Sequence, residues 1–438
     1  MTTDTSAPAR LSADAVRPLR TLDPAGPQDD LAWLDEAIGD ARVVAIGESA
    51  HYNHENYRLR HRLTRYLVER HGFGAYAMES GFVEGWRADD WVRGGDEPLG
   101  EVMANGVTSL MGLWTEMRDH FEWMRAHNRT AERPIGFYGI DLSGSNVSPL
   151  PGIDAVIAYL ALADPEFAVD PGIRETASTF AVPSAFGLAE AIGAYGNLPP
   201  ERRNALTAGL AELTVRMEGQ RLEYQERTGA EAYGRAFRAV RLAAAIDANA
   251  RAIARGDQAS LLSTRDSAIA DTVGWILGRE DRTVLAAHNG HVQRWPVQYP
   301  GLAPASSMGM HLADRIGEDY LVIGTTNGTG RTLNTGTGFY QGELFTDLEP
   351  PRPGTLDALM DASADGPFAT DLRRLSPGDT TAVRAASQLH QGNVVGDVSP
   401  LDAYDVLVHL PRVTAAEPDA TALAHSSQDV QDAFSRGK

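Results

Sequence analysis

The sequence predicts an α/β fold: a mostly parallel sheet flanked by helices, with a helical subdomain inserted between two parts of the core. The apolar runs VVAIGES, GAYAMES and TVLAAH have the length and composition of fully buried strands. Segments of helical periodicity separate such runs, an alternation that is typical of parallel sheets with helical crossovers. A long Ala- and Arg-rich stretch between the last two runs predicts the inserted helices.

The N-terminal part predicts an arm, then a strand, a helix and a second strand. Residues 1–28 are rich in Ala, Pro, Asp and Thr, so we expect a loose arm there. A short helix is expected over 29–39, and a longer amphipathic helix ends at Gly72 as its C-terminal stop. The stretch from Val43 to Met78 therefore predicts a βαβ unit, whose two strands pair in parallel through a right-handed crossover.

The rest of the chain continues this core after a helical interruption. A strand is expected at PIGFYGIDLSG, with Asp141 at its C-terminal end, and further strands at TVLAAHNGH, YLVIGTT and AYDVLVHLPRV. We therefore divide the chain into a loose arm (1–28), a first part of the α/β core (29–150), an inserted helical subdomain (151–265), a second part of the core (266–415) and a disordered tail (416–438).

Composition narrows the chemistry and the partners. A formal charge of −20 disfavours nucleic acids, whose phosphates require clustered cations, and favours a neutral or cationic small molecule. The chain has no cysteine and Lys438 is its only lysine, which excludes thiolate chemistry, disulfides, a pyridoxal Schiff base and a P-loop lysine. Since no apolar run could span a bilayer and no signal peptide is evident, we expect a cytoplasmic protein with no membrane partner.

The first strand end carries a glutamate and a histidine. Glu48 closes the strand within VVAIGES and His51 follows three residues later, so both side chains project where the strand passes into a helix. There the carboxylate can orient the imidazole and raise its basicity, which suits a general base. The spacing also fits a helix-capping pair on the surface, and the motif alone does not decide between the two.

Two histidines follow the strand TVLAAH. His288 and His291 stand three residues apart, and Gly290 allows a tight turn between them. With Glu48 or Glu79 they could ligate zinc, while the alternative is one positioning histidine and one that bonds a backbone carbonyl. Because the chain lacks cysteine and a His-Glu-x-x-His helix, we expect no metal and no other cofactor.

Glu79 closes the very apolar strand within GAYAMES. Burial there would favour the neutral carboxyl group and suit it to proton transfer, unless a cation such as Arg60 lies beside it. The alternative is a buried ion pair with that arginine or a neighbour. Asp141, at the end of the next strand, is a candidate substrate-binding residue. If these strands neighbour each other, their ends gather two glutamates and three histidines in one pocket.

These motifs resemble those of the erythromycin esterase family, within the wider erythromycin esterase-like and succinoglycan biosynthesis-like superfamily. The resemblance is carried by IGESAHYNHENYRLRHRLTRYLVERHGFGAYAMESGFVEGWRADDWVRGG, LWTEMRDHFEWMRAHN, FYGID, AAHNGHV, SMGMHL, DYLVIG and, near the end, YDVLVHLPRVTAAEP. Their order and spacing match from about Val43 to Gly324, which is most of the chain. The glutamate-to-histidine motif combined with the paired histidines is specific for this family, though not for one substrate.

The family is known for hydrolysing the macrolactone ester of erythromycin-type antibiotics, a resistance reaction that needs no metal. The resemblance implies that His51 is the general base that activates water and that Glu48 orients it. Further active-site positions of the family match Arg60, Glu79, His288 and His291. We expect these to position water or substrate and to stabilise charge on the carbonyl oxygen. No serine nucleophile is needed, in agreement with the absence of a Gly-x-Ser-x-Gly elbow.

Several positions depart from the family pattern and bear on the substrate. Tyr52 stands where many relatives have glycine, Met310 where arginine is common, and Thr272 where asparagine is usual. Trp114 is a candidate substrate-binding residue in the wall of an apolar cleft, and the alternative for it is ordinary core packing.

Three classes of function are therefore open. The first is an esterase acting on a polyketide or macrolide, as in antibiotic resistance. The second is a tailoring enzyme of secondary metabolism that lactonises, cyclises or dehydrates with the same Glu/His acid-base site. The third is a haem- or metal-binding module that uses the histidines as ligands, although two strand-end glutamates are not what haem ligation requires.

Overall fold

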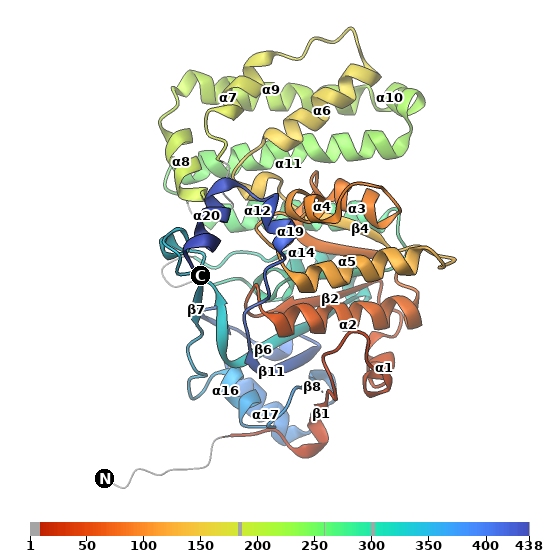
Figure 1. Ribbon diagram of the computed structural model, residues 1–438, viewed down its shortest axis with the longest axis vertical. Coiled ribbons are helices and arrows are strands. Elements are labelled where there is room, and N and C mark those ends of the chain that lie inside the picture. The colour runs from red at the N-terminus through yellow and green to blue at the C-terminus, as the bar shows by residue number, and fades with distance from the viewer. Residues whose placement is uncertain (1–8, 183–185, 258, 299–302, 438) are drawn as a thin grey trace. The chain divides into compact units, whose positions relative to one another are not determined.

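The structure of the protein is a computed structural model, which describes residues 9–182, 186–257, 259–298 and 303–437 (Figure 1). The chain forms two compact units. Unit 1 comprises Met1–Tyr76 and Leu277–Glu417, and unit 2 comprises Ala77–Ile276 and Pro418–Arg436. Within the described ranges, no helix is both long and apolar enough to cross a lipid bilayer.

The main sheet has nine strands that are mostly parallel, and helices flank it, which confirms the predicted fold class. In unit 1 the strand order is β1-β8-β11-β6-β2-β5, and β7 pairs with β6. β2 is parallel to both β5 and β6, and β11 is parallel to β6, whereas β1, β7 and β8 make antiparallel pairs. The strands of this unit are β1 (Arg17–Pro18), β2 (Val43–Glu48), β5 (Thr283–His288), β6 (Tyr320–Leu333), β7 (Phe345–Asp347), β8 (Phe368–Asp371), β11 (Val406–Val413) and the separate hairpin of β9 (Gln388–Gln391) and β10 (Val394–Asp397).

β2 lies inside the sheet and is buried along its whole length. It pairs along one edge with β5 and along the other with β6. The predicted pairing between the strands at 43–48 and 75–81 is therefore wrong, because β2 has no edge left for it. In the register with β5, Glu48 lies opposite His288, so two strand ends that are far apart in the sequence come together.

The predicted helix after β2 is α2 (His54–His71). It ends at Gly72, which has a φ of +69° and donates its N–H to the carbonyl of Val68 at 3.2 Å, while the next residue, Phe73, donates to the carbonyl of Leu67 at 3.3 Å. The predicted glycine stop is confirmed, since this left-handed conformation suits glycine best. The other helices of unit 1 are α1 (Leu34–Ile38), α13 (Asn289–Val292), α14 (Met308–Ile316), α15 (Thr337–Tyr340), α16 (Leu356–Asp361), α17 (Pro377–Ala385) and α18 (Pro400–Ala403).

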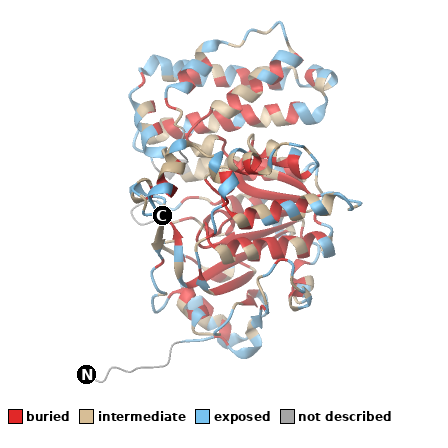
Figure 2. Cartoon of the chain, viewed as in Figure 1, coloured by how far each residue is buried: buried red, intermediate tan, exposed pale blue. Residues whose placement is uncertain are grey.

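Unit 2 contains most of β3 (Ala75–Gly81), its sheet neighbour β4 (Gly136–Asp141) and a large set of helices. The stretch 151–265, which we expect to be helical, holds helices α6 to α11 and the start of α12. These helices have a core of their own, formed by buried side chains such as Val156, Leu210 and Val240. Buried positions along these helices are red in Figure 2. The helices of unit 2 are α3 (Gly85–Val92), α4 (Leu99–Gly106), α5 (Thr115–Asn128), α6 (Leu150–Ala163), α7 (Pro171–Ser178), α8 (Leu188–Gly196), α9 (Pro200–Gly219), α10 (Arg221–Thr228), α11 (Ala230–Ala254), α12 (Ala259–Leu277), α19 (Ala420–Ala424) and α20 (Gln428–Arg436).

The described residues near both ends of the chain form more regular structure than the sequence predicts. In the N-terminal arm, residues 1–8 lie outside the described residues, but Arg17 pairs with Ala369 of β8 and Leu19 is buried. The C-terminal tail, expected to be disordered, instead forms α19 and α20. Phe434 lies on the buried, apolar face of α20, and its ring centre is 6.0 Å from that of Trp114. The tail therefore packs against the rest of unit 2 through this face.

The boundaries of the compact units also differ from the expected division of the chain. They fall after Tyr76 and Ile276, rather than at residues 150 and 265. The reason lies in helix packing around β4, because α3 packs against β4, α4 and α5 within unit 2. Sequence patterns mark where helices begin and end, but they do not show which neighbours the helices choose.

Candidate active site

The turn after β2 is locked against neighbouring segments. A Cβ atom on Gly47 would lie 2.3 Å from the Asn289 Oδ1 atom, so only glycine fits there. Asn289 in turn bonds the backbone of Thr325 in β6, with its Nδ2 donating to the carbonyl at 2.7 Å and its Oδ1 accepting the N–H at 3.1 Å. The Thr325 hydroxyl accepts the N–H of Ser49 at 2.8 Å. These bonds fix the position of the side chains that leave the end of β2.

Glu48 bonds an imidazole with one carboxylate oxygen and a guanidinium with the other. His51 Nδ1 lies 2.6 Å from Glu48 Oε1, and Arg60 Nη1 lies 3.1 Å from Glu48 Oε2. The side chains of Glu48 and Arg60 are 6% and 4% exposed, whereas that of His51 is 26% exposed. A buried ion pair therefore holds the ring of His51, which stays accessible to water.

Arg60 comes from α2 and remains charged in this buried position. Its guanidinium lies over the ring of Tyr57, 4.7 Å from the ring centre. Burial by itself lowers the pKa of Arg60, but the neighbouring Tyr76 and Glu48 raise it, and the pKa stays above its ordinary value. The permanent cation keeps Glu48 in its ionised form, which is the form that accepts the Nδ1–H of His51.

His288, at the end of β5, lies beside His51 with 4.9 Å between the ring centres. Its Nδ1 accepts the N–H of Gly290 at 3.2 Å, so Nδ1 carries no proton and the neutral ring has its proton on Nε2. In His51 the bond to Glu48 places the proton on Nδ1 and leaves Nε2 as an acceptor. The two neighbouring rings therefore offer opposite functions, an acceptor nitrogen on His51 and a donor N–H on His288.

Tyr52, which departs from the family pattern, has a left-handed backbone with a φ of 62°. The carbonyl of Tyr52 accepts the N–H of Ala416 at 3.0 Å, and the carbonyl of His51 accepts the Thr332 hydroxyl at 2.7 Å. A non-glycine residue in this conformation costs ~1–2 kcal/mol. The backbone thus explains why glycine suits this position, and here the surrounding bonds impose the same conformation on a tyrosine.

The β9–β10 hairpin, which no sequence motif marks, contacts the same region. Gly392, in the turn of the hairpin with a φ of +61°, donates its N–H to the carbonyl of Ser49 at 2.5 Å. Gln391 Nε2 lies 3.5 Å from the Oε1 atom of Gln293, which follows α13. The hairpin therefore holds the turns that follow both β2 and β5. Its role depends on partners that are remote in the sequence, so periodicity could not reveal it.

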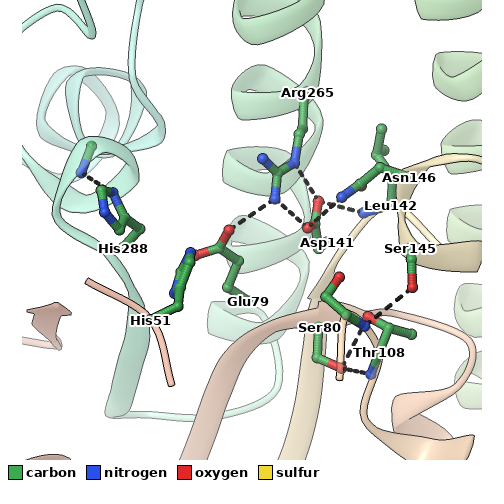
Figure 3. A network of polar contacts seen from close by, with 12 residues as sticks. His51, Glu79, Ser80, Thr108, Asp141, Leu142, Ser145, Asn146, Arg265 and His288 are labelled. Carbon is green, nitrogen blue, oxygen red and sulfur yellow. Dashed lines mark hydrogen bonds and ion pairs between the residues drawn. The ribbon is translucent and has the colours of Figure 1, made fainter. Parts of the chain in front are cut away.

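In unit 2, Glu79 and Asp141 share one arginine (Figure 3). Arg265 Nη2 lies 2.9 Å from Glu79 Oε1 and 2.5 Å from Asp141 Oδ2, and Arg265 Nε donates to Asp141 Oδ1 at 2.9 Å. Asp141 also accepts the N–H of Leu142 at 2.7 Å and a bond from Asn146 Nδ2 at 3.2 Å. This arrangement is the buried ion pair that was one of the two interpretations of Glu79.

Arg265 is a residue of this region that the sequence interpretation missed. Arg60, which we considered as the cation beside Glu79, instead bonds Glu48. Arg265 begins the motif RDSAIADTVGWIL. Two buried carboxylates at strand ends require a cation, and since the chain has a lysine only at its last residue, that cation had to be an arginine. The lateral order of the strands decides which arginine serves which glutamate.

The other candidate residues are buried. His291 lies in α13 and is 8% exposed, and its catalytic role stays a prediction. Trp114 is fully buried at the start of α5 and packs against Phe434, a position that favours core packing over substrate contact. Within the described ranges, no group of three or more His, Asp or Glu side chains is arranged to hold a metal ion.

Comparison with known sequences relates this chain to erythromycin esterases. The family model for erythromycin esterase matches residues 68–413. Erythromycin esterase type II of Escherichia coli is 29% identical over 367 residues, which cover 78% of this chain and 83% of that protein. Erythromycin esterase type I of Escherichia coli is 26% identical over 302 residues, which cover 67% of this chain and 72% of that protein.

Comparison with solved structures extends the likeness to the fold. A mutant of the erythromycin esterase EreC, solved in its open conformation, superposes with a TM-score of 0.76 at 21% sequence identity. The match covers 92% of this chain and 98% of that chain. At this level of identity the superposition shows a shared fold over almost the whole length.

Proposed function

Because the chain belongs to the erythromycin esterase family, we propose that it is a hydrolase that cleaves a carboxylic ester with water activated by His51. The observation that carries this proposal is the 2.6 Å contact between His51 Nδ1 and Glu48 Oε1, with Arg60 on the second oxygen. Family membership supports the hydrolase class, and the roles of individual residues are part of the proposal. We propose a macrolide lactone as the substrate, because both curated relatives are erythromycin esterases.

In the first step, His51 Nε2 accepts a proton from water while the water oxygen bonds to the ester carbonyl carbon. The carbonyl π bond breaks, and its electron pair becomes the charge of an oxyanion. Glu48 stabilises the imidazolium that forms, because its ionised carboxylate already accepts the Nδ1–H. General base catalysis of this kind contributes ~10²- to 10⁴-fold to a rate.

In the second step, the oxyanion re-forms the carbonyl and the bond to the alcohol oxygen breaks. The departing oxygen takes the proton from His51 Nε2, which returns the imidazole to its neutral form. For a lactone the product is the ring-opened hydroxy acid, heavier than the substrate by one water. No covalent enzyme intermediate is needed, which agrees with the absence of a nucleophile elbow in the sequence.

We assign His288 as a hydrogen-bond donor to the developing oxyanion. Its Nδ1 accepts the N–H of Gly290, so the neutral ring has its N–H at Nε2, and the ring lies 4.9 Å from the ring of His51. A neutral donor held in place stabilises an oxyanion without having to move during the reaction. Arg60 acts through Glu48 and is therefore a positioning residue. For Glu79 and His291 we retain the catalytic roles predicted from the sequence.

The test is mass spectrometry of erythromycin incubated with the purified protein after exhaustive chelation. The proposal expects a product heavier by one water with the wild-type protein and none with His51→Ala. His425→Ala, which replaces an exposed histidine after α19, is the matched control and should keep full activity.

Each outcome is informative about a different part of the proposal. Full activity in a folded His51→Ala protein would remove the base assignment and leave the hydrolase class standing. No product with the folded wild-type protein would overturn the macrolide substrate and favour the tailoring enzyme described above. Activity that disappears on chelation and returns with added metal would contradict the metal-free mechanism.

A further inference from the structure

Unit 2 contains a cavity of about 240 Å³ that includes none of the residues assigned to hydrolysis. The described residues that line it come from the start of α3, the end of α4, the loop between α4 and α5, the turn at Gly144–Asn146, the position of Val182 after α7 and the segment between α19 and α20. These segments are far apart in the sequence. A hollow lined by several separate parts of the chain is a candidate binding site, provided that its walls are chemically suited to a ligand.

The two loops that line this cavity are conformationally strained. Tyr52 apart, the described non-glycine residues with a positive φ all lie here: Ser109, Leu110, Ser145 and Asn146, with φ angles of 55°, 59°, 51° and 68°. The N–H of Ser109 donates to the hydroxyl of Ser145 at 3.1 Å and ties the two loops together. Strained backbone of this kind persists only where its surroundings impose it, and it is concentrated at ligand-binding and catalytic sites.

The polar groups in the walls suit a ligand with hydroxyl groups. The Thr108 hydroxyl oxygen accepts the N–H of Gly81 at 2.8 Å, and the Ser145 hydroxyl oxygen accepts the N–H of Ser109 (Figure 3). The Ser145 hydroxyl therefore keeps its own hydrogen for donation, whereas the Thr108 hydroxyl also lies 3.5 Å from the Ser80 hydroxyl, a contact in which either oxygen can be the donor. Asn105 uses its Nδ2 on a backbone carbonyl of α4 at 3.0 Å, which leaves its Oδ1 as an acceptor.

The charge of the walls disfavours an anion. Lys, Arg and His are absent from the described lining residues, so an anionic group would meet no counter-charge. The single carboxyl group is Glu84, whose Oε1 accepts the N–H of Gly144 at 2.6 Å. Its Oε2 is buried beside Gly81 and has no hydrogen-bond partner among the described residues. Burial raises the pKa of Glu84 above its ordinary value, which favours the neutral carboxyl group.

We propose that this cavity binds a small neutral polyhydroxylated molecule, such as a monosaccharide or a polyol. The ligand hydroxyls would bond Thr108, Ser145 and Asn105, and its C–H faces would pack on Val107 and Leu113. The volume is below the ~300–1,000 Å³ of sites for drug-sized ligands, so the cavity accepts about one sugar ring or one end of a larger molecule. This proposal is independent of the proposed hydrolysis.

The first experiment is saturation-transfer NMR on the full chain with a panel of glucose, galactose, mannose, glycerol and myo-inositol. Spermidine and inorganic phosphate serve as the cationic and anionic comparisons. Ala104→Phe fills the cavity from α4, and Ala161→Phe, on the exposed surface of α6, is its matched control. We expect at least one neutral member to bind the wild-type and Ala161→Phe proteins and to lose its signal with Ala104→Phe.

Glu84→Gln separates a neutral ligand from a cation. Glutamine reproduces the neutral carboxyl group and can still accept the Gly144 N–H, so binding of the neutral ligand should survive. Binding of spermidine that disappears in Glu84→Gln, without binding of any neutral member, would overturn the proposal. So would a panel that does not bind at all, or binding that Ala104→Phe leaves unchanged.

Ser145→Gly keeps the proposal testable if Ala104→Phe does not fold. Glycine accepts the left-handed backbone of this position and removes the hydroxymethyl side chain, which also accepts the N–H of Ser109, so affinity should fall at least about tenfold, the equivalent of one hydrogen bond. Unchanged affinity in this variant would contradict the predicted contact. Because the readout is binding, a failure here leaves the ester hydrolysis assay unaffected, and the reverse also holds.

Discussion

Unit 1 and unit 2 each bury a glutamate near a strand end beside an arginine, yet the two glutamates are held differently. Glu48 divides its oxygens between Arg60 and His51, whereas Glu79 shares Arg265 with Asp141. In unit 1 one cation faces one carboxylate, and the second oxygen can orient an imidazole. In unit 2 one cation faces two carboxylates. The number of carboxylates that share one arginine therefore decides how a buried glutamate is used. With one carboxylate the glutamate can also bond a histidine, and with two it forms part of a shared ion-pair cluster.

The pKa values of the two arginines depend on these carboxylates. Burial lowers the pKa of Arg265, but Asp141 and Glu79 raise it more, and the result lies well above the ordinary value. The removal of Arg265 would therefore leave two carboxylates facing each other, while the removal of Arg60 would leave one. Substitutions in the two units should therefore have different consequences for activity and stability.

The largest effect is expected for His51, the imidazole that bonds Glu48 in unit 1. His51→Ala should lower kcat/KM by ~10²- to 10⁴-fold, because no other group would accept the proton from water. His288→Ala should cost less, since it removes one donor to the oxyanion and leaves the base in place. Steady-state kinetics of both variants would check this order. A larger loss in His288→Ala would mean that the two histidines have exchanged roles.

The second prediction concerns the arginine of unit 2. Arg265→Gln should lower the free energy of unfolding by ~3–5 kcal/mol, because it leaves Glu79 and Asp141 buried without a cation. Arg60→Gln should cost less, and the measurement is urea denaturation followed by circular dichroism. Adding Asp141→Asn to Arg265→Gln should restore part of the lost stability. If the double variant is no more stable than the single one, carboxylate repulsion is not the cause.

The third prediction concerns Asp357, a buried carboxyl group of unit 1. Among the described residues, no arginine forms an ion pair with it. Burial raises its pKa from 3.8 to about 7, although Oδ2 accepts the N–H of His390 at 2.8 Å. The folded state therefore holds a proton that the unfolded state has released, so the stability contributed by this group is fully present below pH 3.8 and is lost progressively as pH rises to about 7.

Asp357→Asn should remove this pH dependence. We expect the variant to match the wild-type protein below pH ~4 and, above the pKa of about 7, to be more stable than the wild-type protein by an amount on the order of 4 kcal/mol. Parallel denaturation curves across this pH range would check it. Identical pH profiles for the two proteins would show that another group dominates the titration.

The smallest effect is expected for Glu48→Gln. Glutamine can still accept the Nδ1–H of His51 and hold the ring, but it no longer stabilises the imidazolium by charge. The rate should fall by about tenfold, which corresponds to ~1.4 kcal/mol of transition-state stabilisation. Glu48→Ala, which also removes the acceptor, should cost more. Equal losses in the two variants would mean that the charge, and not the orientation of the ring, carries the whole effect.

Structural features that depend only on neighbouring residues in the sequence could be predicted. The strands ending at Glu48 and His288 could be predicted because continuous apolar runs have few other folded solutions. The glycine stop at Gly72 followed from the left-handed turn that closes a helix. The tail at 416–438 was missed because its short helices gain their stability from tertiary packing, which local composition does not report.

Taken alone, the sequence determined the fold class, the family and the strand-end positions of the candidate residues, since these depend on local pattern and motif order. Only the tertiary structure decided that Arg60 serves Glu48 and that Arg265 serves Glu79. The physical reason is that ion pairs form between residues that the lateral order of strands and the packing of helices bring together. An arginine from a distant helix can reach a strand end as readily as one from the adjacent helix, and the chain does not record that choice in any local pattern.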